Sequence, residues 1–334
     1  MPAGAADRSP RLNAAGAATN VAVKPCPICD GGQAVHERWL DSRHAAGGPF
    51  ELARCTACSF VFTNLLDDAI LRANAGFDDE DTASYESSQS AVDRLWFDHI
   101  CERLARATRQ PRPRVLDVGC GNGLLIERFE RRGWEVAGVD LSSWAERAAR
   151  QMGFRLYRGT IETAPLPTGY FDVVTSTSTL EHIPKLVPHV EAVLRVLKPG
   201  GQAYFAGMPN YGSLSVRAGL SAFHHNRPPR HANWFTPRTL RRLFAHPAIR
   251  PGVARLSVRT YGIPELHRLY AVALARLRGS RHRGGGPLLR GPANGGASQR
   301  VLRWLVQLNY HGGRPLGVGD KLELVVTAGT ERGR

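Results

Sequence analysis

The sequence predicts an α/β protein, in which a doubly wound, seven-stranded mixed sheet follows a small segment with paired cysteines. Three observations predict this architecture. Short apolar stretches alternate with helix-like stretches from residue 111 onward, which is typical of a sheet with helices on both faces. The run Val115–Gly123 (VLDVGCGNG) leads from an apolar strand into a glycine-rich turn, and a helix-like segment follows. Two CxxC pairs lie within the first 58 residues.

The glycine turn indicates which kind of ligand the sheet binds. Glycine allows a positive φ and lets a ligand approach the backbone closely. The helix that follows begins with unpaired N–H groups and a partial positive charge. A dinucleotide fingerprint has the spacing G-x-G-x-x-G. Here Gly119, Gly121 and Gly123 have the spacing G-x-G-x-G, and Leu124 stands at the dinucleotide position. This disfavours a nicotinamide-dependent dehydrogenase.

The remaining elements are expected in regular alternation. A helix over residues 91–108 precedes the turn, because its apolar side chains recur on one face. After the turn, helices are expected over 124–132, 141–150 and 187–198. Strands are expected over 134–140, 154–158, 171–175, 202–206, 254–261 and 320–327. The last two strands are expected to pair with each other.

Asp117, two residues before the first glycine, completes a pattern that resembles motif I of class I S-adenosylmethionine-dependent methyltransferases. The resemblance covers about residues 115–330, and it implies a Rossmann-like sheet, S-adenosylmethionine as cofactor and methyl transfer as the reaction. It also implies that Gly119, Gly121 and Gly123 pass under the methionine part of the cofactor. Asp117 then helps to hold the cofactor's ammonium group.

Four further residues are candidates for the cofactor site. Asp140 ends the second expected strand, where an acid can accept hydrogen bonds from ribose hydroxyls, and Leu141 follows it. Asp140 could also cap the next helix. The resemblance implies that Glu162 faces the adenine amino group; the alternative is a solvated surface glutamate. It also implies that a tyrosine-bearing segment folds over the cofactor, for which Tyr85 is the candidate, unless it is an exposed loop residue.

Two histidines are candidates for the catalytic step. Methyl transfer from a sulfonium requires a positioned acceptor and removal of a proton, and histidine titrates near neutrality. His182 lies in a Leu-Glu-His segment that resembles the family's motif after the fourth strand. Its alternative role is a hydrogen bond to the loop backbone. His231 lies in a segment, residues 230–237, that resembles one where a histidine faces the acceptor. Tyr211 is a further candidate for the pocket wall.

The four cysteines of the two CxxC pairs predict a structural zinc site. Two such knuckles can supply four thiolates to one tetrahedral ion, and a site with four protein ligands is closed to substrate. Disulfides are the alternative, which the missing signal-peptide pattern and a cofactor made in the cytosol both disfavour. The segment after the second pair resembles a subgroup of methyltransferases with an N-terminal zinc ribbon that act on sugars or other small metabolites. The ligands would be Cys26, Cys29, Cys55 and Cys58.

The sequence divides into five expected regions. They are a disordered tail (1–24), a zinc ribbon (25–65), a helical cap or linker (66–110), the methyltransferase core (111–262 and 319–330) and a basic helical insertion or lid (263–318) with a flexible part at 278–298.

The positive charge is concentrated in one region. The chain carries a formal net charge of +15, yet residues 212–315 contain 18 arginines and a single acid, so the rest of the chain is nearly neutral. An anionic small acceptor, an anionic membrane surface or RNA would each explain this excess. A genome rich in G and C explains the preference for arginine over lysine, but not the scarcity of acids.

The sequence therefore predicts methyl transfer to a small acceptor that is anionic or contains a sugar, with a lipid-linked acceptor left open, at oxygen, nitrogen or carbon. The first alternative is an rRNA or tRNA methyltransferase, and the second is a non-catalytic binding module. A cytoplasmic location is expected, with peripheral contact at the inner membrane face left open, since no apolar stretch reaches 18 residues. The oligomeric state is not indicated.

Overall fold

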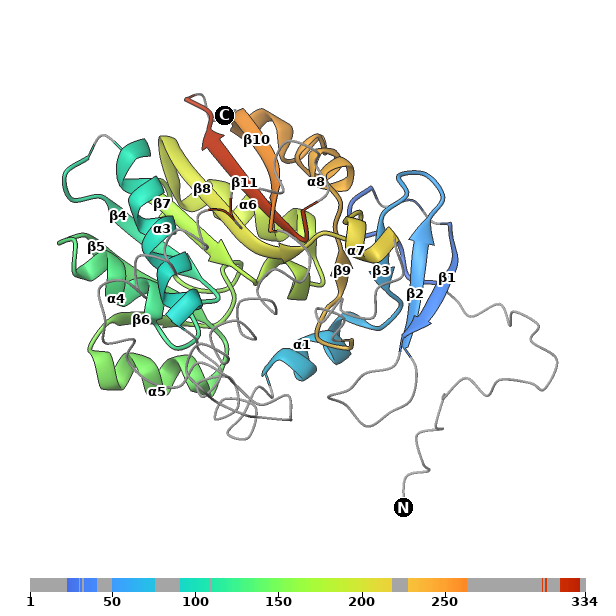
Figure 1. Ribbon diagram of the computed structural model, residues 1–334, viewed down its shortest axis with the longest axis horizontal. Coiled ribbons are helices and arrows are strands. Elements are labelled where there is room, and N and C mark those ends of the chain that lie inside the picture. The colour runs from blue at the N-terminus through green and yellow to red at the C-terminus, as the bar shows by residue number, and fades with distance from the viewer. Residues whose placement is uncertain are drawn as a thin grey trace, which may run out of the picture.

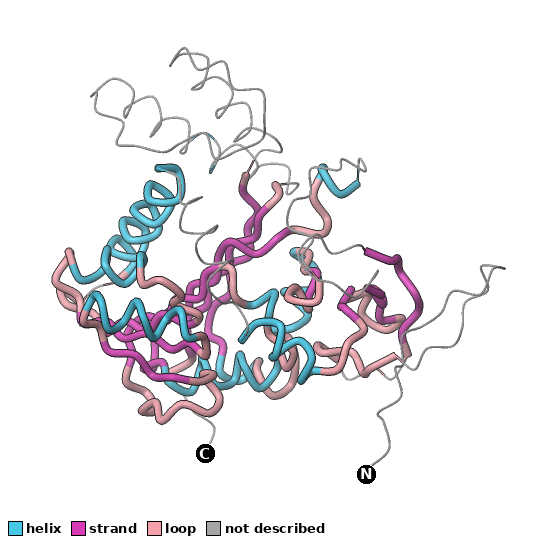
Figure 2. Tube along the Cα trace, turned by 90° about the horizontal axis from the view of Figure 1, so that it is seen from below, coloured by secondary structure: helices cyan, strands magenta, loops and turns pink. Residues whose placement is uncertain are grey.

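The computed structural model (Figure 1) describes residues 23–29, 31, 33–40, 50–75, 91–108, 110–217, 228–262, 308, 310 and 319–330. These residues form two sheets. The larger sheet has seven strands in the order β10-β11-β8-β7-β4-β5-β6, and the smaller has four in the order β1-β2-β3-β9. Figure 2 shows the small sheet beside the large one.

The large sheet is mixed, as predicted. Its parallel part comprises β4 (Arg114–Val118), β5 (Glu135–Asp140), β6 (Arg155–Arg158), β7 (Phe171–Thr177) and β8 (Leu197–Pro209). β11 (Lys321–Ala328) pairs antiparallel with β8 and with β10 (Val253–Tyr261). The pairing of the last two strands is therefore confirmed. β4 and β7 are neighbours, and ligands of open α/β sheets bind at the carboxyl ends of such central strands.

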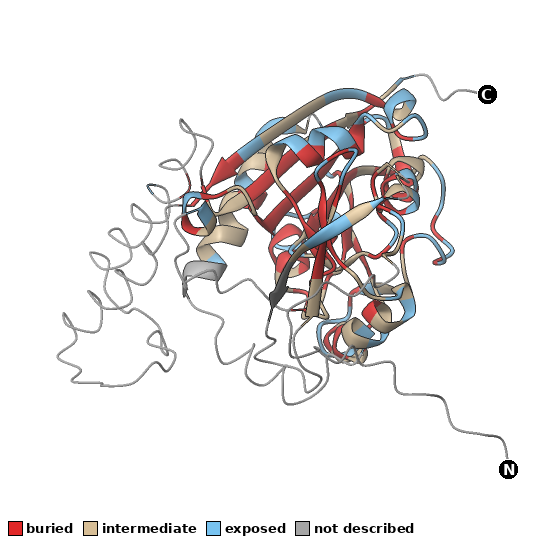
Figure 3. Ribbon diagram, turned by 90° about the vertical axis from the view of Figure 1, so that its right-hand side faces the viewer, coloured by how far each residue is buried: buried red, intermediate tan, exposed pale blue. Residues whose placement is uncertain are grey.

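Neighbouring residues of the central strands point to opposite faces and enter different cores. Val115, Val173 and Tyr204 pack with α3 (Ala91–Ala107) and α4 (Leu124–Glu130) on one face. Leu116, Val174 and Phe205 pack with α6 (Leu186–Val196) and α8 (Pro237–Phe244) on the other. α5 (Ser143–Met152) packs beside α4. This alternation buries both faces of the sheet, which Figure 3 shows as strands coloured mostly as buried.

The small sheet is built from two distant parts of the sequence. β1 (Ala34–Leu40), β2 (Phe50–Cys55) and β3 (Val61–Thr63) form an antiparallel meander. Its fourth strand, β9 (Asn233–Trp234), comes from the region expected to belong wholly to the methyltransferase core. The apolar residues of the cysteine-rich segment belong to the same core cluster as α6 and α8. The two expected regions are thus packed together and share a sheet.

Short elements complete the fold. They are α1 (Asp67–Ala75), the 3-10 turn η1 (Leu180–His182), α7 (Leu214–Arg217) and the 3-10 turn η2 (Arg250–Gly252). The expected helices and strands are present with shifts at their ends. The largest shift is in β8, which begins at Leu197 because residues 198–201 form an irregularity inside the strand after α6 has ended at Val196. Among the residues in the ranges above, no helix is long and apolar enough to cross a membrane.

Candidate functional site

The glycine turn lies at the carboxyl end of β4, and its backbone has the conformation that the sequence predicts. Gly119, Gly121 and Gly123 all have positive φ angles, of 72°, 50° and 72°. Gly123 is the N-cap of α4 and has no side chain to cap it. At this helix N-terminus the Asn122 side chain accepts a hydrogen bond from the Leu124 amide at 3.4 Å, whereas the three glycines add no side chain between the backbone of the turn and a polar ligand.

The three glycines are also required by packing. A Cβ at Gly119 would overlap the side chain of Thr179, which follows β7. A Cβ at Gly121 would come within 3.0 Å of the Trp144 ring, and one at Gly123 within 2.7 Å of the Phe154 ring. The side chains of three other segments thus hold the turn in place.

Asp140 is the last residue of β5, and its carboxylate is held beside the turn. One oxygen accepts a hydrogen bond from the Gly121 amide at 3.0 Å, and the other accepts one from the Ser142 amide at 2.8 Å. The N-cap of α5 is Ser142, which accepts a hydrogen bond from Ala145, so the capping role considered for Asp140 falls to its neighbour. The two amides orient the Asp140 carboxylate, and each oxygen keeps a lone pair for a ligand.

Asp117 lies inside the sheet with 2% of its surface exposed. The hydroxyl of Thr175, its neighbour on β7, donates a hydrogen bond to the carboxylate at 2.7 Å. Burial raises the pKa of Asp117 to about 7, and the charge of Asp140 acts in the same direction, although the Thr175 hydrogen bond opposes it. A buried carboxyl group in this state gains its charge most easily when a cation comes near.

Of the other three cofactor candidates, the structure describes Leu141 and Glu162 but not Tyr85. Leu141 follows Asp140 directly, beside the turn. Glu162 follows β6 and accepts a hydrogen bond at 2.9 Å from the buried His189 of α6. This contact helps to lower the pKa of Glu162 to about 2 despite burial, which acts in the opposite direction. Glu162 is thus held by a partner that the sequence did not indicate. Tyr85 lies outside the described residues, as does the insertion over 263–318.

On the other side of the sheet's carboxyl edge, the structure brings both candidate histidines together. The rings of His182 and His231 lie 4.7 Å apart, edge to face. With Glu181 they form a group whose ligand atoms all lie within 4.8 Å of one another. Carboxylate and imidazole groups in such a cluster can exchange a proton or share a cation.

The backbone fixes the tautomer of His182. Its Nδ1 lies 3.0 Å from the Arg230 carbonyl oxygen. A carbonyl can only accept, so Nδ1 carries the proton, and in the neutral ring the lone pair is on Nε2. The sequence-based alternative of a loop hydrogen bond is therefore observed for Nδ1 of His182.

Glu181 is the residue of this cluster that the sequence analysis did not single out. It is 2% exposed, and one carboxylate oxygen, Oε2, is buried with no hydrogen-bond partner among the described residues. Burial raises the pKa of Glu181, while its own backbone amide and the nearby charge of Lys321 lower it. Its position beside His182 in the Leu-Glu-His segment was the signal that could have identified it.

Tyr211 contacts the small sheet, which the sequence did not indicate. Its hydroxyl donates a hydrogen bond at 3.1 Å to Glu37 of β1, and Arg54 of β2 holds the same carboxylate at 2.6 and 2.7 Å. Tyr211 also packs in a small cluster with Leu52, Val61 and Trp234. It therefore joins the small sheet to the segment after β8.

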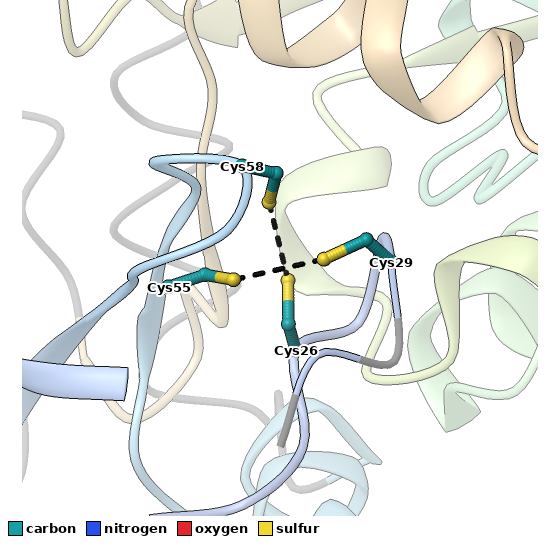
Figure 4. A group of neighbouring side chains, drawn as sticks. All are labelled: Cys26, Cys29, Cys55 and Cys58. Carbon is teal, nitrogen blue, oxygen red and sulfur yellow. Dashed lines mark hydrogen bonds between the residues drawn. The ribbon is translucent and has the colours of Figure 1, made fainter. Parts of the chain in front are cut away.

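The four cysteines of the CxxC pairs converge on one point (Figure 4). The Sγ atoms of Cys26 and Cys58 lie 3.5 Å apart, and those of Cys29 and Cys55 lie 3.6 Å apart. A tetrahedron with Zn–S bonds of about 2.3 Å has edges of about 3.8 Å, so the sulfur positions fit a zinc ion. None of the four forms a disulfide. Cys101 in α3 and Cys120 in the glycine turn are buried elsewhere.

The comparison with known proteins agrees with this geometry. Residues 88–246 match a family described as a methyltransferase domain. This match places a methyltransferase domain over these residues of the chain, and the sheet order and the glycine turn agree with it.

Individual relatives cover only part of the sequence. The ubiquinone biosynthesis O-methyltransferase of Hahella chejuensis is 39% identical over 122 residues, which are 34% of this chain and 50% of that protein. The protein of the same name from an Azoarcus species is 42% identical over 101 residues, 28% of this chain and 43% of that protein. The chain thus spans about half the length of the curated relatives it matches. A methyltransferase structure from Archaeoglobus fulgidus overlaps 69% of this chain and 94% of its own, at 19% identity and a TM-score of 0.45.

Proposed function

We propose that the protein transfers a methyl group from S-adenosylmethionine to a small acceptor, with an oxygen as the methylated atom. The observation that carries this proposal is the glycine turn, whose three left-handed glycines lie beside an oriented Asp140 carboxylate. The relatives named O-methyltransferases support oxygen among the three possible atoms.

Most of the cofactor side would be formed by residues 117–141, which are close together in the sequence. When bound, S-adenosylmethionine supplies an electrophilic methyl group on a sulfonium. Gly119, Gly121 and Gly123 would offer it backbone, and Asp140 would accept hydrogen bonds from its ribose hydroxyls. Asp117 would ionise and attract its ammonium group, since a nearby cation favours the charged form of a buried carboxyl. Leu141 and Glu162 would lie at the nucleoside end, and Tyr85 would cover it.

The acceptor side would be the Glu181, His182 and His231 cluster. Nε2 of His182 would accept the proton that the acceptor hydroxyl loses, because Nδ1 is already bound to Arg230. Glu181 would stabilise the resulting imidazolium by its charge, and His231 would contact the acceptor. General-base catalysis of this kind contributes about 10²–10⁴-fold to a rate.

Cys26, Cys29, Cys55 and Cys58 would bind one structural zinc ion as thiolates. The fit of the sulfur positions and the absence of a disulfide among these four residues support this. An ion with four protein ligands has no open position for substrate, so its contribution would be to fold the small sheet.

The arginine-rich region supports an acceptor with an anionic group, such as a phosphorylated or nucleotide-linked sugar or a carboxylate. A lipid-linked acceptor would bring peripheral contact with an anionic membrane.

The test is a calorimetric titration of the zinc-loaded protein with S-adenosylmethionine and S-adenosylhomocysteine, followed by transfer of labelled methyl groups. Wild type should bind both ligands, and Asp140→Ala should lose most of the affinity. The transfer assay should label hydroxyl-bearing acids and nucleotide sugars, but not RNA. Transfer to RNA alone would contradict the small acceptor. Binding of neither ligand would contradict the enzyme and favour a binding module.

A further inference from the structure

We infer that Thr63 is a positioning residue for the acceptor-side histidines, so that the small sheet forms part of the acceptor site. This rests on the proposed function for its consequence, but its geometry stands on described contacts alone. Thr63 is the last residue of β3 and is fully buried.

The Thr63 side chain binds directly to the segment that carries His231. Its hydroxyl donates a hydrogen bond to the His231 carbonyl oxygen at 2.7 Å and accepts one from Nε1 of Trp234 at 3.3 Å. The Thr63 amide also donates to the Ala232 carbonyl at 2.9 Å. A hydroxyl that is both donor and acceptor in a dry environment has a fixed direction, so it fixes the peptide to which it binds.

The same segment holds the other two residues of the cluster. The Ala232 amide donates to the Glu181 carbonyl at 2.8 Å, and the Arg230 carbonyl accepts from His182. Nδ2 of Asn233 donates to the Leu180 and Ile183 carbonyls, at 3.1 and 2.6 Å, on either side of the cluster. Residues 230–233 thus connect β3 to η1 through a hydrogen bond at each position.

The cysteine cluster sets the position of β3. Only two residues separate Cys58 from β3, and the Cys55 amide donates to the Phe60 carbonyl at 2.8 Å. Phe60 in turn packs against Phe62 and Phe235. Strands of three and two residues are too short to hold a position by pairing alone. The position of β3 is therefore also fixed by the cysteine knuckle before it and by the Thr63 hydrogen bonds at its end.

None of the hydrogen bonds described above involves the glycine turn. The side chains that pack against the turn come from the loop after β7, from α5 and from Phe154 just before β6. Removal of the Thr63 hydroxyl should therefore disturb the histidines and leave cofactor binding unchanged.

The test is histidine NMR on full-length, zinc-loaded protein labelled at the imidazole carbons, with signals assigned by His182→Gln and His231→Gln. Thr63→Val removes the hydroxyl and keeps the shape, and Thr63→Ser keeps the hydroxyl. We expect Thr63→Val to shift the His231 and His182 signals, and Thr63→Ser to restore them towards wild type. The His189 signal should not move, because this residue binds Glu162 far along the sequence.

Thr56→Val is the matched control, because the Thr56 hydroxyl also donates to a backbone carbonyl in the small sheet, that of Gln33, but on an exposed turn. It should leave both signals in place. If Thr63→Val does not fold, Thr63→Ala removes the same hydroxyl with a smaller side chain and should shift the same two signals. Unchanged His182 and His231 signals in the folded variant would overturn the inference.

Calorimetry with S-adenosylmethionine on the same samples separates the two proposals. In Thr63→Val we expect an affinity for S-adenosylmethionine within about twofold of wild type, a difference of about 0.4 kcal/mol. A wild type that does not bind the cofactor would defeat the proposed function, yet the histidine shifts would still report on Thr63. Loss of cofactor affinity in Thr63→Val alone would show a general structural role and overturn the positioning role.

Discussion

The two sides of the proposed site are built in different ways. The cofactor side takes Asp117, the three glycines and Asp140 from 24 consecutive residues, joined by the register of β4 and β5. The acceptor side takes its parts from the cysteine-rich segment, η1 and residues 230–234, which lie far apart in the sequence. The cofactor-side residues follow one another along the chain and are supported by neighbouring elements of the large sheet, whereas the acceptor-side residues also depend on the cysteine-rich segment. The two sides should therefore respond differently to substitution.

The largest expected effect comes from replacing two of the four cysteines, which should affect the acceptor side much more than the cofactor side. Cys55→Ser with Cys58→Ser should abolish zinc binding, unfold the small sheet and stop methyl transfer, since binding of a structural zinc is coupled to folding. Cofactor affinity should fall far less than turnover. Zinc analysis, circular dichroism and calorimetry measure these effects. The control is Cys101→Ala, which replaces a buried cysteine of α3 outside the four-cysteine cluster. This variant should bind zinc as wild type does. Full turnover without zinc would contradict the account.

The next effect concerns the charge inside the cofactor side. The pKa of Asp117 is raised to about 7 in the folded protein from an ordinary value of 3.8. The folded state therefore favours the protonated carboxyl of Asp117. The resulting contribution to the free energy of unfolding is fully present below about pH 4 and is lost as the pH rises to about 7. A shift of three units corresponds to at most about 4 kcal/mol.

Asp117→Asn should remove this part of the pH dependence, because asparagine does not titrate. Urea unfolding at pH 4 to 8 measures the difference in slope between the two proteins. Parallel curves would show that the buried carboxyl has an ordinary pKa. The affinity of wild type for S-adenosylmethionine should also rise with pH in this range if the ionised form holds the ammonium group.

A smaller effect tests how tightly the glycine turn is packed. Gly119→Ala adds a Cβ at a φ of 72° against the side chain of Thr179, and it should cost about 3 kcal/mol of stability and at least about tenfold in cofactor affinity. Gly133→Ala is the matched control, since Gly133 has a φ of 73° but nothing within 4 Å of the added atom. It should cost about 1 kcal/mol, from the left-handed backbone alone. Equal losses in both variants would show that packing around the turn is unimportant.

The smallest effect is expected at the joint between the small sheet and the core. Tyr211→Phe removes the hydrogen bond to Glu37 and keeps the aromatic packing, so it should cost about 1 kcal/mol. Thermal unfolding should show a decrease of a few degrees, with cofactor affinity unchanged. A loss of cofactor affinity here would show that the two sides are not independent.

The same contrast explains how much of the molecule the sequence predicts. The glycine turn and the order of the large sheet are predicted because their signals are local: positive-φ glycines, apolar strands and the spacing between them. Short motifs in the sequence also single out both histidines, which the structure brings together, while their role at the acceptor stays a prediction. It does not predict β9, since two residues carry no periodicity, and nothing in Thr63 or Asn233 indicates partners more than 50 residues away. Nor does it predict that His189 holds Glu162, because the contact depends on how α6 packs.

The most direct test of the central claim is a calorimetric titration of S-adenosylmethionine into the same protein before and after zinc removal by a chelator. We expect an affinity that stays within about threefold, because none of the described cofactor-side residues lies in the small sheet. Methyl transfer should be lost on removal and should return when zinc is restored. Loss of cofactor binding together with the zinc would contradict the account, since the two sides would then be one cooperative site.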